Sequence, residues 1–334
     1  MSIINTPIHI RNIELRNRLV MPPMATAKAE NDGKVTKQLC DYYAEKSNGG
    51  YIGLIITEHS YISPEGKASK GQLSISDDSD ISGLKRLVSA IHQNNTRVIA
   101  QINHAGGAAI QEITGYDSLS ASSVRIPRPT APEILPKEMT HKDIEKVVSD
   151  FSRAASRAKE AGFDGVEIHS AHGYLLNQFF SPLTNKRDDE YAGSSICGRI
   201  KLHSEIINAV REAVGNDYLV ALRLGACDYM DGGSTLNDSV FAAKEFERAG
   251  IDLLDISGGF CGYIRQGVNE QGYFSDLTEA IKNNVAIPVI LTGGIVDIEA
   301  AEDLLSNRKA DLIGVGRAIL KDSEWAGKAI SSLE

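Results

Sequence analysis

Two histidines and a tyrosine stand close together near the middle of the chain, at His169, His172 and Tyr174. Both imidazole rings could donate a hydrogen bond to one oxygen atom and polarise it, while the tyrosine hydroxyl supplies a proton. A lone histidine here would more often be structural. A metal site would need a carboxylate or cysteine at ligand spacing, and this stretch offers none. The cluster therefore predicts a site that binds a carbonyl oxygen without a metal ion.

Glycines and an arginine near the C-terminus form a second group. One stretch holds Gly293 and Gly294, and the next holds Gly314, Gly316 and Arg317. Each glycine pair follows a short apolar run and leads into a helical pattern, which leaves backbone N–H groups free to face an anion. Arg317 could add a bidentate contact with a phosphate. One glycine pair alone is typical of a tight turn, but two pairs with an arginine favour a site for a phosphorylated ligand.

Two polar residues, Gln101 and Arg223, end runs that are otherwise almost entirely apolar. A buried arginine needs an anionic partner, which could be a ligand or a neighbouring carboxylate such as Asp255 or Asp228. The amide of Gln101 could cap a strand or bind the polar edge of a ring. Both alternatives stay open on the residues alone.

Short apolar runs alternate with helical patterns and must position these side chains. The runs span residues 18–21, 53–57, 97–102, 165–169, 219–224, 253–257, 288–292 and 312–315. The clearest helical pattern spans 141–161, with apolar residues spaced three and four apart, a start at Thr140 and an end at Gly162. This alternation predicts a parallel sheet buried on both faces. Eight units predict a (β/α)₈ TIM barrel, whose active site lies at the C-terminal ends of the strands.

The remaining segments fit the same fold as additions to a barrel. Residues 8–15 predict a β-hairpin that caps the barrel floor, and residues 103–139, rich in proline, predict a long lid or binding loop after the third strand. An open, doubly wound sheet is the competing fold, but the G-x-G-x-x-G fingerprint after the first strand is missing. Since no linker interrupts the pattern, we expect one domain over residues 1–334.

Composition narrows the class of partner and the cellular compartment. A net charge of −9 argues against nucleic acid or an anionic membrane as partner. The longest apolar runs are far too short to cross a bilayer, and the charged first twenty residues do not fit a signal peptide. Four scattered cysteines fit a reducing compartment. We therefore expect a cytoplasmic protein that acts on a small molecule.

Longer motifs along the chain resemble the old yellow enzyme family. They are Pro-Pro-Met at 22–24, Gln101 with His-Ala-Gly at 104–106, HSAHGYL at 169–175, SPLTNKR at 181–187, DEYAG at 189–193, Arg223, and Gly314 to Arg317. Their order and spacing are similar over roughly residues 3–320. The HSAHGYL and SPLTNKR stretches are the most specific.

The resemblance implies an oxidoreductase that binds FMN, takes hydride from NADH or NADPH, and reduces the activated C=C bond of an α,β-unsaturated carbonyl or related acceptor. It implies that His169 and His172 bind the carbonyl oxygen, and that Tyr174 protonates the α-carbon. Gln101 would contact the pyrimidine edge of the flavin, and Arg223 the region of N1. The other flavin contacts that it implies are Pro23, Met24, Ala25, His59, Gly258, Gly293, Gly294, Gly316 and Arg317.

Departures from the family pattern and two rival functions remain. Ala25 and Ala27 replace residues that many members place beside the flavin and the substrate. The sequence ends without the extension that carries an iron–sulfur cluster and a second flavin in larger relatives, so we expect direct reduction by NAD(P)H. A homo-oligomer is compatible with the sequence.

One rival function is that of a flavin-free aldolase or isomerase acting on a phosphorylated substrate, with Glu58 as its nearest carboxylate. The other is an FMN-binding protein without enzymatic activity.

Overall fold

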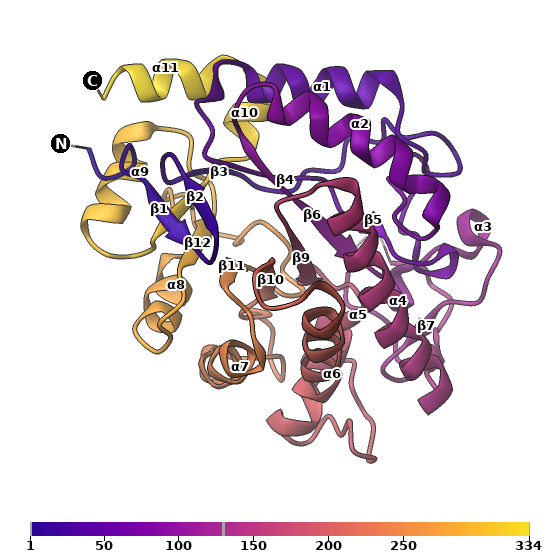
Figure 1. The fold of residues 1–334 in the computed structure, drawn as a ribbon. Coiled ribbons are helices and arrows are strands. Elements are labelled where there is room, and N and C mark those ends of the chain that lie inside the picture. The colour runs from indigo at the N-terminus through magenta and orange to yellow at the C-terminus, as the bar shows by residue number, and fades with distance from the viewer. Residues whose placement is uncertain (1, 129–130, 334) are drawn as a thin grey trace.

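Eight parallel strands form a closed barrel in the computed structural model, which describes residues 2–128 and 131–333. In chain order they are β3 (Leu19–Met21), β4 (Leu54–Ile56), β6 (Arg97–Asn103), β9 (Gly165–Ser170), β10 (Leu219–Gly225), β11 (Leu253–Ser257), β12 (Val289–Thr292) and β13 (Leu312–Gly314). Each strand pairs in parallel with the next, and β13 pairs with β3 to close the ring (Figure 1). The predicted (β/α)₈ barrel is confirmed, and every predicted strand begins and ends within one residue of its observed bounds.

Alternate residues of each strand enter two different apolar surroundings, which explains why the runs are almost wholly apolar. In β4, Leu54 and Ile56 belong to a cluster that fills the barrel, whereas Ile55 packs in the layer between strands and helices. Successive side chains of a strand point to opposite faces. A barrel strand covered by helices therefore buries both faces.

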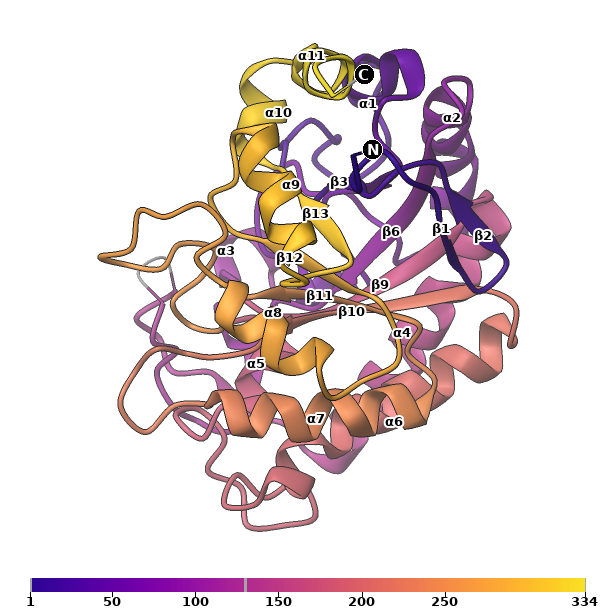
Figure 2. The ribbon, with the colours of Figure 1, turned by 90° about the vertical axis from the view of Figure 1, so that its left-hand side faces the viewer.

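A layer of helices surrounds the barrel (Figures 1 and 2). The helices are α1 (Lys37–Ser47), α2 (Ile81–His92), α4 (His141–Ala161), α5 (Leu175–Phe180), α6 (Ile196–Val214), α7 (Leu236–Ala249), α8 (Ser275–Lys282), α9 (Ile298–Ser306), α10 (Arg317–Lys321) and α11 (Trp325–Ser331). The ends of α4 lie where the sequence predicts them. Thr140 and Asp143 form a capping box at its start, and Gly162 ends it with a left-handed φ of 91°.

A hairpin closes the N-terminal end of the barrel, as the sequence predicts. Its antiparallel strands, β1 (Ile8–Ile10) and β2 (Ile13–Leu15), place Ile10, Ile13 and Leu15 in the cluster that fills the barrel. That cluster includes Leu219 and Leu312, the first residues of β10 and β13. The opposite end, where the strands finish, is therefore the end available to a ligand.

The insertion at residues 103–139 is more ordered than its sequence predicts. It contains α3 (Gln111–Thr114) and two short strands, β7 (Leu119–Ser120) and β8 (Lys137–Glu138), which pair in parallel with Leu119 opposite Lys137. Strands of two residues are too short to produce a periodic pattern, so sequence reasoning could not find them. A further two-residue strand, β5 (Ser60–Tyr61), pairs in parallel with the last two residues of β6.

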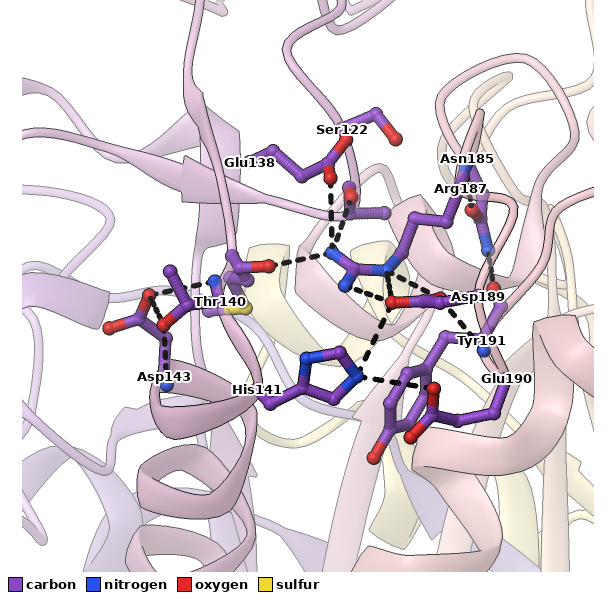
Figure 3. Close-up of polar contacts among 12 residues, drawn as sticks. Ser122, Glu138, Thr140, His141, Asp143, Asn185, Arg187, Asp189, Glu190 and Tyr191 are labelled. Carbon is purple, nitrogen blue, oxygen red and sulfur yellow. Dashed lines mark hydrogen bonds and ion pairs between the residues drawn. The ribbon is translucent and has the colours of Figure 1, made fainter.

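A buried arginine fastens this insertion to the segment that follows α5 (Figure 3). Nη1 of Arg187 donates to the carbonyl oxygens of Ala121 and Met139, at 3.2 and 2.7 Å, and Nε donates to Asp189 at 3.1 Å. Asp189 also accepts from the backbone N–H of Tyr191 at 3.0 Å. We call these five residues the Arg187 junction. The SPLTNKR and DEYAG motifs thus hold the middle of the insertion, at Ala121, and its C-terminal end, at Met139.

Other features of the fold bear on the compartment and the domain boundaries. Within the described ranges, no helix combines the length and the apolar character that a membrane-spanning segment needs. One continuous hydrophobic cluster includes residues from Ile4 to Ile330. The single domain over 1–334 and the cytoplasmic location stay predictions.

Candidate active site

A cavity of about 400 Å³ lies at the C-terminal ends of the barrel strands. That volume falls within the usual range for pockets that hold cofactors and small molecules. Thirteen of the fourteen predicted site residues line it. They are Pro23, Met24, Ala25, His59, Gln101, His169, His172, Tyr174, Arg223, Gly293, Gly294, Gly316 and Arg317.

Gly258 is the exception, because its neighbour Ser257 lines the cavity instead. A Cβ atom on Gly258 would lie 2.3 Å from both the sulfur of Cys261 and the carbonyl oxygen of Gly262. The position therefore needs glycine so that the loop after β11 can fold tightly. The structure assigns Gly258 this packing role and no place on the wall of the cavity.

Three histidines and a tyrosine form one contiguous cluster on the cavity wall. The ring centroids of His169 lie 5.3 Å from those of both His172 and Tyr174, and the ring of His59 lies 5.3 Å from Tyr174. Gln72 lies 2.7 Å from Nδ1 of His59 through its amide nitrogen, which can only donate. His59 therefore keeps its proton on Nε2. The sequence predicts the grouping of His169, His172 and Tyr174, and the structure adds His59 to it.

These histidines are neutral at physiological pH. Burial, followed by the charges of Arg128 and Arg223, lowers the pKa of His59 to about 4. Burial and the neighbouring His172 and Arg223 lower the pKa of His169 well below its usual value. Burial and the two arginines do the same to the pKa of His172. A neutral imidazole can donate one hydrogen bond to a ligand without adding a positive charge.

The backbone of His172 adopts a left-handed conformation, with φ of 60°. Only a few per cent of non-glycine residues do so, and histidine, asparagine and aspartate are enriched among them. Nε2 of His172 lies 2.7 Å from the hydroxyl of Ser257, at the end of β11. The turn from β9 into α5 therefore aims this ring across the barrel mouth instead of along the strand.

A layer of charged groups lies beneath the histidines. Arg223 is only 4% exposed, and its Nε lies 3.1 Å from a carboxylate oxygen of Asp255. The geometry is too bent for a hydrogen bond, so both atoms lack a hydrogen-bond partner. The sequence left open whether Arg223 faces a ligand or a neighbouring carboxylate. The structure places the carboxylate of Asp255 beside it, as an ion pair without a hydrogen bond. Because Arg223 also lines the cavity, its guanidinium remains available to a ligand.

A second carboxylate in this layer holds the amide of Gln101. Nε2 of Gln101 donates to Oε1 of Glu167 at 2.7 Å, and both side chains are buried. Burial and the charge of Asp255 raise the pKa of Glu167 to about 8. Glu167 is therefore mostly protonated at neutral pH. Gln101 uses its nitrogen for this bond and has its oxygen left to meet a ligand.

The residues after β12 and β13 fit a phosphate group at the edge of the cavity. Gly294 has a left-handed φ of 69°, and a Cβ there would lie 2.5 Å from the ring of Tyr273. The exposed guanidinium of Arg317 lies next to it, with Nη2 3.5 Å from that Cβ position. Arginine with exposed backbone N–H groups is a common phosphate site in this fold. The buried Arg223, whose Nε lacks a hydrogen-bond partner, fits an electron-rich ring edge, so the donor set fits FMN.

Sequence reasoning missed two charged residues at this site. Glu167 interrupts the apolar run of β9, a signal that could have been read from the sequence. Arg128 lines the cavity from the 103–139 insertion, and no pattern in that proline-rich stretch indicates it. Glu58, the carboxylate considered for an aldolase, does not line the cavity and accepts the backbone N–H of Thr26 at 2.8 Å.

Comparison with known proteins agrees with this geometry. The family model for NADH:flavin oxidoreductase / NADH oxidase matches residues 4–334. The chain belongs to this family. This membership confirms the predicted resemblance and, with it, FMN as cofactor and a nicotinamide nucleotide as the class of electron donor. The flavin-free aldolase or isomerase is therefore set aside.

Individual members of the family are similar over almost the whole chain. An NADH oxidase from Thermoanaerobacter brockii is 40% identical over 329 residues, covering 96% of this chain and 49% of its own length. An NADPH dehydrogenase from Bacillus subtilis is 36% identical over 330 residues, covering 98% of this chain and 94% of its own. The solved old yellow enzyme homologue from Zymomonas mobilis has a TM-score of 0.87 at 25% identity, covering 99% and 93%. The chain thus spans about half of the first relative and nearly all of the others.

Proposed function

We propose that this family member reduces the activated C=C bond of an α,β-unsaturated carbonyl compound, with FMN as its redox group and NADH or NADPH as donor. The observation that carries the proposal is the meeting of His169, His172 and Tyr174 on one wall of the cavity. A protein that only stores or senses FMN has no use for carbonyl-binding donors beside a tyrosine hydroxyl.

The two histidines bind and polarise the carbonyl oxygen of the acceptor. The β-carbon of an unsaturated carbonyl compound is only weakly electrophilic until electron density is drawn toward the oxygen. Neutral imidazole N–H groups placed in advance around that oxygen stabilise the negative charge that develops on it. Burial, with a contribution from the charge of Arg223, lowers the pKa of both rings and keeps them neutral, so that each presents one N–H donor.

Tyr174 holds the proton that the α-carbon of the acceptor must receive. Its side chain is only 7% exposed and lies against the rings of His59 and His169. General-acid catalysis by a positioned side chain typically contributes 10²- to 10⁴-fold in rate. The hydroxyl therefore acts on the same molecule whose carbonyl oxygen the histidines bind.

The other side chains hold the cofactor and exclude water from it. FMN, when bound, would supply hydride transfer between the nicotinamide and the acceptor. Arg317 and the glycines after β12 and β13 would hold its phosphate, while Gln101 and Arg223 would hold the polar edge of its ring. Met24 and Ala25, which follow β3 and line the cavity, would lie against the ring. Because donor and acceptor must approach the same group, we expect them to exclude each other and to give ping-pong kinetics.

The test is anaerobic stopped-flow spectroscopy of the purified holoprotein. We expect a yellow protein with about one FMN per chain, bleached by NADH or NADPH and reoxidised rapidly by 2-cyclohexenone. Cyclohexanone, the saturated control, should not reoxidise it. A yellow protein that the enone reoxidises no faster than buffer does would overturn the proposal in favour of an FMN-binding protein without this activity. A colourless protein that refuses FMN would overturn the cofactor as well.

A further inference from the structure

Arg128 is a third cation on the cavity wall, and it comes from the insertion rather than from a strand end. Its guanidinium carbon lies 4.5 Å from the centroid of the Tyr174 ring, and Nη2 lies 3.4 Å from the Tyr174 hydroxyl. Stacking on an aromatic face holds a guanidinium in a defined place. Nη2 donates to the Tyr174 hydroxyl, and the stacking leaves the other N–H groups at the edge of the guanidinium available to a ligand.

The charges around the cavity leave Arg128 without an anion. Arg128, Arg223 and Arg317 line it, the neighbouring histidines are neutral, and no carboxylate is among its lining residues. Arg223 has Asp255 within 3.1 Å, and Arg317 fits the phosphate of FMN. Across the described ranges, no carboxylate lies within ion-pair distance of Arg128. A partly buried arginine in this state is a ready binding group for a carboxylate.

The position of Arg128 identifies which molecule would bring that anion. Tyr174 neighbours both Arg128 and His169, with its ring centroid 4.5 Å from the guanidinium carbon and 5.3 Å from the ring centroid of His169. An anion bound by Arg128 therefore lies beside the carbonyl site itself. The phosphates of a nicotinamide nucleotide are separated from its reactive ring by a ribose, so they are a poorer match to this position.

We propose that Arg128 selects acceptors that carry a carboxylate close to the unsaturated carbonyl group. The inference rests on the proposed function, since it names the class of acceptor. The reaction adds one hydride and one proton across the C=C bond and oxidises NAD(P)H to NAD(P)⁺. The carboxylate is not changed, because its only role is to be bound.

Two matched pairs of probes separate the effect of the carboxylate from the effect of shape. In the first, 4-hydroxybenzoate and its methyl ester bind to the oxidised holoprotein, and the long-wavelength band of the stacked phenol is titrated. In the second, trans-4-oxo-2-pentenoate and its methyl ester reoxidise the reduced holoprotein in stopped flow. Within each pair, the ester lacks the negative charge and carries one additional methyl group.

The variants are Arg128→Met, which keeps an unbranched apolar stem but removes the guanidinium, and Arg125→Met as control. Arg125 is exposed on the same insertion, does not line the cavity, and loses the same charge. We expect Arg128→Met to weaken binding of both carboxylate probes by roughly ten- to a hundredfold, the usual value of a charge-assisted hydrogen bond. Binding of the esters should change less than about threefold. Arg125→Met should leave all four probes unchanged, and thermal unfolding should be similar in the three proteins.

Several outcomes overturn the inference. Equal losses for acid and ester would mean that Arg128 only shapes the site through Tyr174, and no loss would mean that it faces solvent. A selective loss in reduction by NADH and NADPH would assign Arg128 to the phosphates of the donor. In each case the wild-type protein still reduces the ester, so the proposed function survives. If the wild-type protein reduces neither ester nor acid, the proposed function fails and the inference with it.

Discussion

The Arg187 junction and the strand-end cavity each contain a buried arginine, but the two are satisfied very differently. Arg187 donates hydrogen bonds to two backbone carbonyl oxygens and to the carboxylate of Asp189. Arg223 has a carboxylate nearby, but neither Nε nor the facing oxygen of Asp255 has a hydrogen-bond partner. The protein thus supplies hydrogen-bond acceptors for Arg187 and leaves Nε of Arg223 without one.

This difference separates structural groups from ligand-binding groups. A buried polar group without a partner costs free energy, so it persists where a ligand supplies the missing bond. Asp189 of the junction also lies close to His141 and Glu190, and the ligand atoms of these three residues are near enough to share a metal ion. Arg187 already compensates the charge of Asp189, so this cluster belongs with the structural contacts (Figure 3). We expect changes in the cavity to alter reactions and changes in the junction to alter stability.

The largest effect is expected for Tyr174→Phe in the cavity. Transfer of hydride from NAD(P)H needs no proton from Tyr174, so flavin reduction should be nearly unchanged. Reoxidation by an enone should slow by about 10²- to 10⁴-fold, because the α-carbon loses its general acid. Stopped-flow rates of the two half-reactions measure this split. Tyr191→Phe, which removes a hydroxyl bonded to Glu205 at 2.9 Å near the junction, is the control and should change neither rate. Equal rates in Tyr174→Phe and wild type would show that the Tyr174 hydroxyl is idle.

Arg187→Met should have the next largest effect, and on stability instead of rate. Breaking a buried ion pair costs about 3–5 kcal/mol. We expect about 3 kcal/mol, the lower end, because the Asp189 side chain is 23% exposed and water can solvate it. Urea unfolding of the apoprotein measures the loss. The matched change Arg223→Met should cost less, because burial raises the pKa of Asp255 and lets that carboxyl take up a proton. A larger loss in Arg223→Met than in Arg187→Met would reverse the comparison.

Arg317→Ala should weaken the binding of FMN to the apoprotein by roughly ten- to a hundredfold, through loss of a charge-assisted bond to phosphate. Riboflavin lacks the phosphate and should bind both proteins alike, which makes it the control ligand. Fluorescence quenching of each flavin gives the dissociation constants. If riboflavin and FMN lose affinity equally, Arg317 contacts the ring or supports the fold, and the phosphate site lies elsewhere.

The smallest effect concerns pH and Glu167. Its pKa rises from a usual value of 4.5 to about 8 in the folded chain, by burial and then by the charge of Asp255. Between these values the folded state binds more protons than the unfolded state, so the free energy of unfolding must fall as pH rises. Glu167→Gln removes this contribution while keeping an acceptor for Gln101, so its stability should fall less between pH 5.5 and 8. Urea unfolding of both apoproteins at the two pH values checks this. Parallel pH profiles would contradict the assignment of the proton to Glu167.

The sequence predicts the barrel well because strands and helices leave periodic patterns that local physics explains. The bounds of β11 and α4 agree residue by residue with the predicted ones. The grouping of His169, His172 and Tyr174 is equally predictable, since strand ends of a (β/α)₈ barrel converge whatever the sequence between them. Its residue types, taken at those ends, indicate the chemistry.

What the sequence could not predict depends on contacts between distant segments. Arg128 reaches the cavity only because the insertion folds back over Tyr174, and Gly258 leaves the cavity wall because Cys261 packs against it. The partners of Arg187 lie 48 and 66 residues away in the chain. No periodicity or spacing rule encodes such pairings, so these positions were open until the tertiary structure placed them.

The left-handed backbone at His172 restricts which residue types can occupy this position of the pocket. Glycine, asparagine, aspartate and histidine are the residues that tolerate such a φ angle at low cost. Glycine has no side chain to offer, and aspartate presents a negative charge to an oxygen that is itself becoming negative. Among the three possible replacements for His172, only asparagine both tolerates the left-handed φ angle and offers a neutral hydrogen-bond donor. Saturation mutagenesis at position 172 should therefore yield active proteins with histidine or asparagine, and much lower activity with the other residue types.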